Sequence, residues 1–151
     1  MSAVPSEAEL RLLFRETDRD ELELAPDLSF PLTVESARTW SVGPRVFLVF
    51  RDRPGARLRG IVFHRNSGAL PDVVAMCEWC HAVRGHGRVK LLSCKTDDRR
   101  RLGIYLCNDL ACVEPSGAPR GPDDIPDGLD GAERARRALA RAAELAARRL
   151  F

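Results

Sequence analysis

The sequence predicts an α+β fold: a small antiparallel β-sheet with one helix near the N-terminus and one at the C-terminus. Three observations support this prediction. A helix-capping pattern opens the chain, apolar runs of strand length occupy its middle, and an alanine-rich amphipathic segment closes it. With 151 residues, 44% of them hydrophobic, the chain can bury one ordinary core. No apolar run approaches the roughly 18 residues that a membrane span requires.

The first helix is predicted from a capping box. Ser6 is followed three residues later by Glu9, so the Ser oxygen can accept from the Glu9 amide while the Glu9 side chain reaches back. An apolar stripe then follows at helical spacing, formed by Leu10, Leu13 and Phe14. We expect the helix to continue to about residue 18 or 20. Pro26 and Pro31 then predict a loop, because each restricts the backbone of the residue before it.

From Trp40 onward the pattern is that of strands. Residues 46–50 are all apolar, which predicts a strand over 45–51 buried on both faces. A Pro-Gly turn follows, and a second strand is expected over 59–65, so the two strands should form a β-hairpin. His64 lies at the end of the second strand, and we expect it to be a solvated or hydrogen-bonded residue rather than a metal ligand.

Two close pairs of cysteines predict a metal site. Cys77 and Cys80 form the first pair, and Cys107 and Cys112 follow after a segment long enough to fold back as a hairpin. Four thiolates suit Zn²⁺, which accepts a tetrahedral sulfur shell with bonds of about 2.3 Å. Such a shell leaves no position for substrate, so we expect the zinc to be structural.

The cysteines allow other interpretations. Disulfides require an oxidising compartment, but the charged N-terminus has no secretory pattern. Iron can occupy the same tetrahedron of sulfurs. His81 or His86 could replace one thiolate, although the spacing favours the four cysteines. The fifth cysteine, Cys94, is expected to be a buried core residue.

The segment between the cysteine pairs predicts a second hairpin. Alternating residues favour a strand over 88–94, a polar tip over 95–99 and a returning strand over 102–107 that delivers Cys107. Cys112 is expected in the first turn of a helix, whose positive N-terminus favours a thiolate. A cysteine turn, a hairpin and a helix carrying the last ligand form a treble-clef zinc finger.

The C-terminal part divides into a linker and a helix. Residues 117–130 are rich in Pro, Gly and Asp and predict a linker after a domain spanning 1–116. Residues 131–151 predict a basic amphipathic helix. Its apolar face consists of Leu139, Ala142, Ala143, Ala146 and Leu150. We expect this face to pack on the domain, with a partner-binding or RNA-contacting arm as the alternative.

The cysteine motifs resemble a known family. Cys77-x-x-Cys80 together with Gly103-Ile-Tyr-Leu-Cys107-Asn-Asp-Leu-Ala-Cys112 looks like the C-terminal treble-clef domain of the FusB-type proteins, which bind elongation factor G and protect the ribosome against fusidic acid. The most specific element is Cys-x-Asp-Leu-x-Cys, and the likeness covers about residues 6–116. It implies a cytoplasmic protein-binding module that contacts the translocase, or a related ribosome-bound partner, without chemistry of its own.

Two features depart from the family pattern. The resistance proteins carry a separate helical domain before the zinc domain, for which this chain has no room. The aromatic residue expected after the first cysteine is Glu78 here, with Trp79 displaced by one position. Fusidic acid resistance is therefore not inferred.

A partner-binding surface is predicted around the second hairpin. Interfaces depend on a few aromatic or arginine anchors, and the candidates here are Trp79, Lys95, Arg99, Arg100, Arg101 and Tyr105. Their basic charge would steer an acidic partner. Alternatively, the aromatic residues belong to the core and the arginines to a solvated turn.

The basic hairpin also supports a second function class. Zinc modules with basic loops and aromatic residues bind RNA through phosphate contacts and stacking. A pI of 8.4 and eight acidic residues in positions 1–30 argue against RNA as the sole target. Enzyme function is the weakest hypothesis, because the sequence has no nucleophile elbow, phosphate-binding loop or dinucleotide fingerprint.

Overall fold

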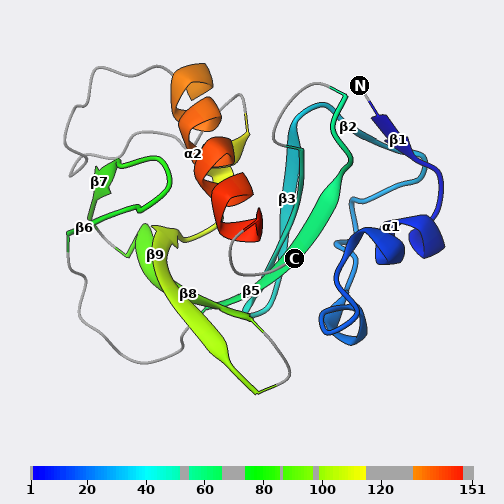
Figure 1. The fold of residues 1–151 in the computed structure, drawn as a ribbon, viewed down its shortest axis with the longest axis horizontal. Coiled ribbons are helices and arrows are strands. Elements are labelled where there is room, and N and C mark those ends of the chain that lie inside the picture. Colours follow the sequence, from blue (N-terminus) through cyan, green and yellow to red (C-terminus); the bar gives the residue numbers. More distant parts are fainter. Residues whose placement is uncertain are drawn as a thin grey trace.

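A five-stranded antiparallel sheet of order β3-β4-β5-β8-β9 forms the centre of the molecule (Figure 1). The computed structural model describes residues 2–51, 55–65, 74–85, 87–96, 99–114 and 131–147. The strands of the sheet are β3 (Ala37–Val42), β4 (Arg45–Phe50), β5 (Arg59–Arg65), β8 (Val89–Lys95) and β9 (Arg101–Cys107). The two predicted hairpins are both present, because β4 pairs with residues Arg59 to His64 of β5, and β8 pairs with β9 along its whole length.

Among the described residues, two short ladders and two helices complete the fold. The ladders pair β1 (Ser2–Val4) with β2 (Leu32–Val34), and β6 (Ala75–Met76) with β7 (Val83–Arg84). The helices are α1 (Glu7–Leu13) and α2 (Gly131–Leu145), and 3₁₀ turns occur at Arg19–Glu21 and Ala111–Val113. Together they make the α+β architecture that the sequence predicts.

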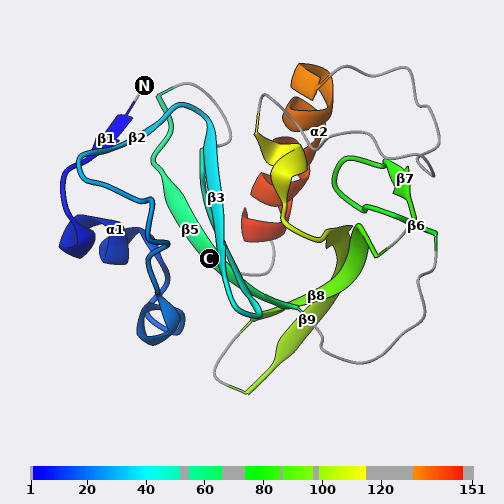
Figure 2. The same ribbon diagram turned by 180° about the vertical axis from the view of Figure 1, so that it is seen from behind.

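The central hairpin divides the core into two clusters, one on each face of the sheet. Alternate residues of a strand point to opposite faces. Val46, Leu48 and Phe50 therefore join the cluster that contains the paired cysteines and α2, whereas Phe47 and Val49 join a cluster with the N-terminal segment. This explains why residues 46–50 are all apolar. Figures 1 and 2 show α2 on one side of these strands and α1 with β1 and β2 on the other.

Helix α2 packs back on the domain, as its amphipathic pattern predicts. Leu139, Ala142 and Ala146 are buried in the cluster that holds the cysteines. The helix also packs against the 3₁₀ turn at Ala111–Val113. It therefore closes the core beside the metal centre.

The N-terminal helix is shorter than predicted. Ser6 caps it as expected, because the Glu9 amide donates to Ser6 Oγ. However, α1 ends at Leu13, and Phe14 takes an extended conformation that bridges Gly60 of β5. Tertiary contacts of the Phe14 ring thus outweigh the local helical pattern. The ladder of β1 and β2 was not predicted, because three-residue strands carry almost no periodicity.

Some predictions concern residues outside the described ranges. They are the linker over 117–130, the centre of the turn at 52–54, His86, the hairpin tip at 97–98, and the end of the last helix beyond residue 147. Among the helices that the structure describes, none is long and apolar enough to cross a membrane.

Glu21 connects the N-terminal segment to the sheet. Its carboxylate lies 2.8 Å from His64 Nε2 and 3.2 Å from Lys95 Nζ. Burial raises the pKa of Glu21, but the hydrogen bonds and charges of His64 and Lys95 lower it more, so the net shift is downward from 4.5. An acid with a lowered pKa stabilises the fold above its ordinary pKa and loses that contribution as the pH falls through the folded-state value.

We therefore expect Glu21→Gln to lower the free energy of unfolding by about 1 kcal/mol at neutral pH. The difference from the wild type should disappear as the pH falls through the lowered pKa of Glu21. Urea unfolding between pH 3 and pH 7 measures it, with the exposed Glu16→Gln as the matched control. A difference that stays constant over this range would show that the charge of Glu21 does not contribute.

Candidate metal centre and its surroundings

The two cysteine pairs converge on one point. The Sγ atoms of Cys77, Cys80, Cys107 and Cys112 all lie within 4.8 Å of one another, and all four side chains are buried. Cys80 Sγ and Cys107 Sγ are 3.7 Å apart. A tetrahedron with metal–sulfur bonds of about 2.3 Å has edges of about 3.8 Å. The distance is far too long for a disulfide of about 2.05 Å and fits one edge of a Zn–S₄ shell.

The first pair sits on a tight turn between β6 and β7. His81 N donates to Cys77 O at 2.8 Å, and His81 has a positive φ of 64° that reverses the chain. Two further amides face the sulfurs: Cys80 N lies 3.5 Å from Cys77 Sγ, and Ala82 N lies 3.4 Å from Cys80 Sγ. Amide donors stabilise negative charge on sulfur, so this turn favours thiolate ligands.

The second pair lies where β9 ends. Cys107 is the last residue of the strand, and a turn with Leu110 at a φ of 57° brings Cys112 back toward it. Asp109 Oδ1 accepts from Ala111 N at 3.0 Å and supports this turn. The Asp-Leu pair of the motif therefore shapes the turn between the ligands. The predicted helix around Cys112 is only the 3₁₀ turn Ala111–Val113, so a helix N-terminus does not account for its ligand character.

The chemistry of the four thiols favours a divalent cation. Hydrogen bonds from Cys107, Cys112 and Cys80 lower the pKa of Cys77. Cys107, Cys77 and Cys80 raise the pKa of Cys112, because a further thiolate beside the others is disfavoured. Four thiolates at this spacing therefore need a cation among them. Zn²⁺ supplies that charge and accepts the tetrahedral sulfur set, so its role here is structural.

Other candidate ligands lie outside this set. His81 Nδ1 is 3.5 Å from Arg137 Nη1, and His64 bonds Glu21. Cys94 is fully buried in the same core but is not one of the four converging sulfurs, and burial raises the pKa of its thiol to about 11. Cys94 is thus a neutral core residue, as the sequence indicated.

Trp79 is buried, whereas a docking anchor must be exposed. Only 3% of its surface is exposed, and its ring meets Phe63 edge to face at 5.6 Å. Trp79 therefore fits the alternative prediction that it belongs to the core. Trp79 braces the zinc turn against the sheet.

The candidates on the second hairpin are at the surface or at its edge. Tyr105 is 41% exposed, and Arg99, Arg100 and Arg101 are exposed next to the hairpin tip. Lys95 instead reaches Glu21 and lies 3.5 Å from the Thr17 carbonyl oxygen. Tyr105 and the three arginines therefore share the β8–β9 hairpin, while Lys95 holds the N-terminal segment.

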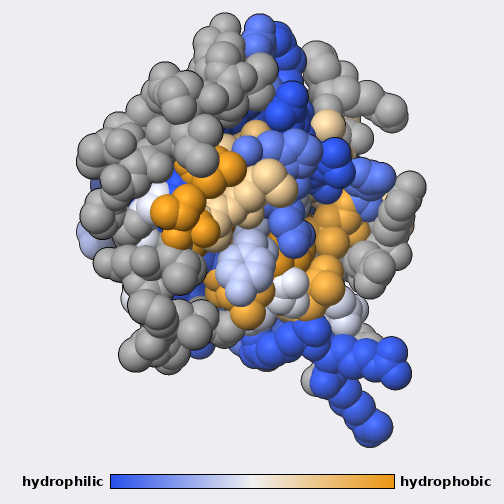
Figure 3. All heavy atoms as spheres, turned by 90° about the vertical axis from the view of Figure 1, so that its left-hand side faces the viewer, coloured by the Kyte–Doolittle hydropathy of each residue, from blue (hydrophilic) through white to orange (hydrophobic). Residues whose placement is uncertain are grey.

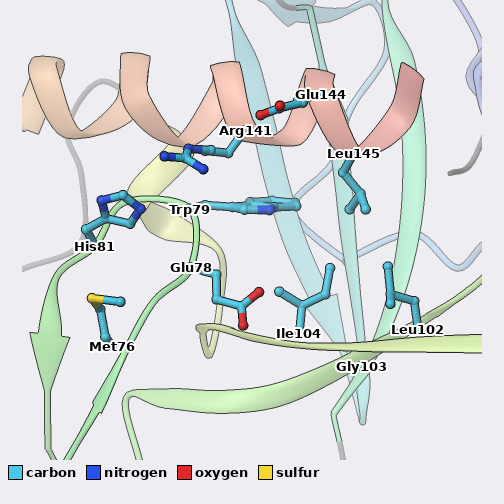
Figure 4. A pocket seen from close by; sticks show the side chains of 10 residues that line it. All are labelled: Met76, Glu78, Trp79, His81, Leu102, Gly103, Ile104, Arg141, Glu144 and Leu145. Carbon is cyan, nitrogen blue, oxygen red and sulfur yellow. The ribbon is translucent and has the colours of Figure 1, made fainter. Parts of the chain in front are cut away.

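A groove of about 490 Å³ beside the metal centre was not predicted. Its walls come from the zinc turn, β9 and α2 (Figure 4). The lining residues are Met76, Glu78, Trp79, His81, Leu102, Gly103, Ile104, Arg141, Glu144 and Leu145. Three segments distant in sequence form it, so no local motif could have indicated it.

Comparisons with known proteins agree with this geometry. The model of one family, the FBP C-terminal treble-clef zinc-finger, matches residues 36–148. The match includes all four cysteines and α2, and it begins after α1. No curated protein and no solved structure matches the chain. With three quarters of its length matched and four sulfurs gathered as this type of finger requires, the chain belongs to the FBP C-terminal treble-clef zinc-finger family.

Proposed function

We propose that this chain is a non-catalytic interaction module of the cytoplasm that binds elongation factor G or a related ribosome-bound partner. Family membership and the resemblance of its motifs to the FusB-type proteins support the identity of the partner. The observation that carries the interaction role is the β8–β9 hairpin, which ends in a zinc ligand and presents Tyr105 with three arginines to solvent.

The zinc makes this surface suitable for binding. Cys107 fixes the end of β9, and Glu78 N donates to Tyr105 O at 2.8 Å, so the backbone that carries Tyr105 is held from the zinc turn. A rigid aromatic residue loses little conformational entropy when it is buried by a partner. Arginine and tyrosine are also the residue types most enriched among interface anchors.

The charge of the hairpin indicates an acidic partner surface. Arg99, Arg100 and Arg101 would steer such a partner and form charge-assisted hydrogen bonds with its carboxylates. A closed shell of four thiolates leaves no open coordination position, which supports a role without catalysis.

Binding to purified elongation factor G tests this proposal. We expect Tyr105→Ala and Arg100→Glu each to weaken binding at least tenfold in isothermal titration calorimetry, because a tenfold change corresponds to about 1.4 kcal/mol and interface anchors contribute more. The exposed Leu12→Ala, on helix α1, should bind like the wild type. Absence of binding by the wild type, or unchanged binding by both hairpin variants, would contradict the proposal.

The same titration distinguishes RNA binding. Phosphate contacts release counterions, so affinity for ribosomal RNA would fall steeply between 50 and 200 mM salt, by about 10³-fold for six contacts. Binding to the translocase should fall far less. If RNA alone binds and the translocase does not, the rival function replaces the proposed one.

A further inference from the structure

The groove beside the metal centre has a composition that indicates its own ligand. We propose that it binds a protein segment in which an arginine or lysine side chain stands next to an apolar side chain. This proposal rests on the proposed function in one respect, that the module captures a protein partner. It differs in the surface used, because the groove lies between β9 and α2 and not at the arginines of the hairpin tip.

The apolar part of the groove provides a contact for the apolar side chain. Leu102 and Ile104 of β9 lie opposite Leu145 of α2, beside the Trp79 ring (Figure 4). Met76, which lies below His81 in Figure 4, is 50% exposed. Figure 3 shows apolar side chains gathered on this face of the molecule. Contiguous exposed apolar surface of this kind marks interaction sites in soluble proteins.

Two carboxylates provide a contact for the cation. Glu78 comes from the zinc turn and Glu144 from α2, and they lie on opposite sides of the Trp79 ring (Figure 4). A guanidinium or ammonium group in the groove can form a charge-assisted hydrogen bond with either carboxylate. The acidic side chains of the groove are therefore complementary to a basic side chain.

The positive charge of the groove, on Arg141, lies toward its other end. Arg141 directs its guanidinium toward His81 and away from Leu145 (Figure 4). His81 in turn lies 3.5 Å from Arg137. The groove thus has one cationic end and one end that is acidic and apolar. This polarity gives the bound segment a direction, because its basic side chain is repelled from the end at His81.

The walls of the groove are held in place before any segment binds. Cys77 and Cys80, on either side of Glu78 and Trp79, are both zinc ligands. The opposite wall, α2, buries Ala142 and Ala146 in the core. A preformed groove limits the entropy that a short segment loses on binding.

Two peptides probe the groove without any translocase. One is acetylated and amidated Ala-Ala-Leu-Arg-Leu-Ala-Ala, and the other carries Glu in place of Arg. Each is titrated into zinc-loaded ¹⁵N-labelled protein, in which Trp79 and Trp40 give separate indole N–H signals. Trp40 lies in the other core cluster and serves as an internal reference. We expect the Arg peptide to shift the Trp79 signal alone and to bind at least fivefold more tightly than the Glu peptide.

Charge reversal completes the test. Glu78 is exposed, so Glu78→Lys should retain zinc and the Trp40 signal while losing the preference for the Arg peptide or inverting it. Glu144→Lys provides the same test from α2, and Glu16→Lys, which changes the net charge equally on the other side of the sheet, should keep the wild-type preference. Equal binding of the two peptides, no shift at Trp79, or an unchanged preference in both groove variants would overturn the proposal. Because elongation factor G is absent, its failure to bind would not change these results.

Discussion

Replacement of Cys107 by Ser is expected to abolish zinc binding and to unfold the domain at physiological temperature. A serine hydroxyl does not replace a thiolate at neutral pH, and the three remaining sulfurs would stay crowded in the core. Structural zinc contributes about 10–16 kcal/mol of apparent binding energy in small fingers. That range equals or exceeds the roughly 5–15 kcal/mol by which whole domains are stable. Elemental analysis and thermal unfolding followed by circular dichroism measure the two effects.

Cys94 supplies the matched control for this experiment. It is equally buried and also a cysteine, but it lies outside the group of four sulfurs. Cys94→Ala should retain a full equivalent of zinc and lower the free energy of unfolding by only about 1–2 kcal/mol, as expected for removing one small buried group. Full zinc content with an unchanged melting curve in Cys107→Ser would refute the structural role of the metal.

The metal centre was predictable because its chemistry is local in sequence. Each cysteine pair occupies one tight turn, so the spacing alone indicated which sulfurs would meet once the hairpin folded. The strands of both hairpins were predicted for a similar reason, since an unbroken apolar run indicates the first hairpin and alternating residues indicate the second. The core position of Cys94 follows from its place in an alternating strand.

Features that depend on contacts between distant segments were not predictable. Trp79 looks like an exposed anchor in the sequence, because it is an aromatic residue between two ligands. Its burial depends on Phe63 and on α2, which lies more than fifty residues later. The groove has the same origin. Likewise, Lys95 belongs to the basic hairpin in sequence, but its partner Glu21 comes from the N-terminal segment.

The two faces of the sheet are covered by different parts of the chain. One face carries the zinc, α2 and the groove, and all of it falls within the residues that match the family. The other face is covered by the segment 2–35, which precedes the match and buries its own cluster. Substitutions on the second face should therefore change stability without changing the metal centre, and Phe14 is the residue that tests this most sharply.

Phe14→Ala is expected to lower the free energy of unfolding by about 3–5 kcal/mol, the usual loss for a fully buried Phe. The Phe14 ring packs edge to face with Trp40 and Phe47, at 6.4 Å and 6.3 Å. It also lies so close to Gly60 that a Cβ atom there would be 2.7 Å from the ring, so the ring packs directly on a residue that has no side chain. Urea unfolding should show a lower midpoint, while zinc content stays at one equivalent because the ring contacts only the second face.

Leu12→Ala, which alters a side chain that is 55% exposed on the same segment, should change stability by less than about 0.5 kcal/mol. If Phe14→Ala were no less stable than Leu12→Ala, the N-terminal segment would not be an integral layer of the fold. Loss of zinc from Phe14→Ala at low urea would instead show that the two faces of the sheet are coupled.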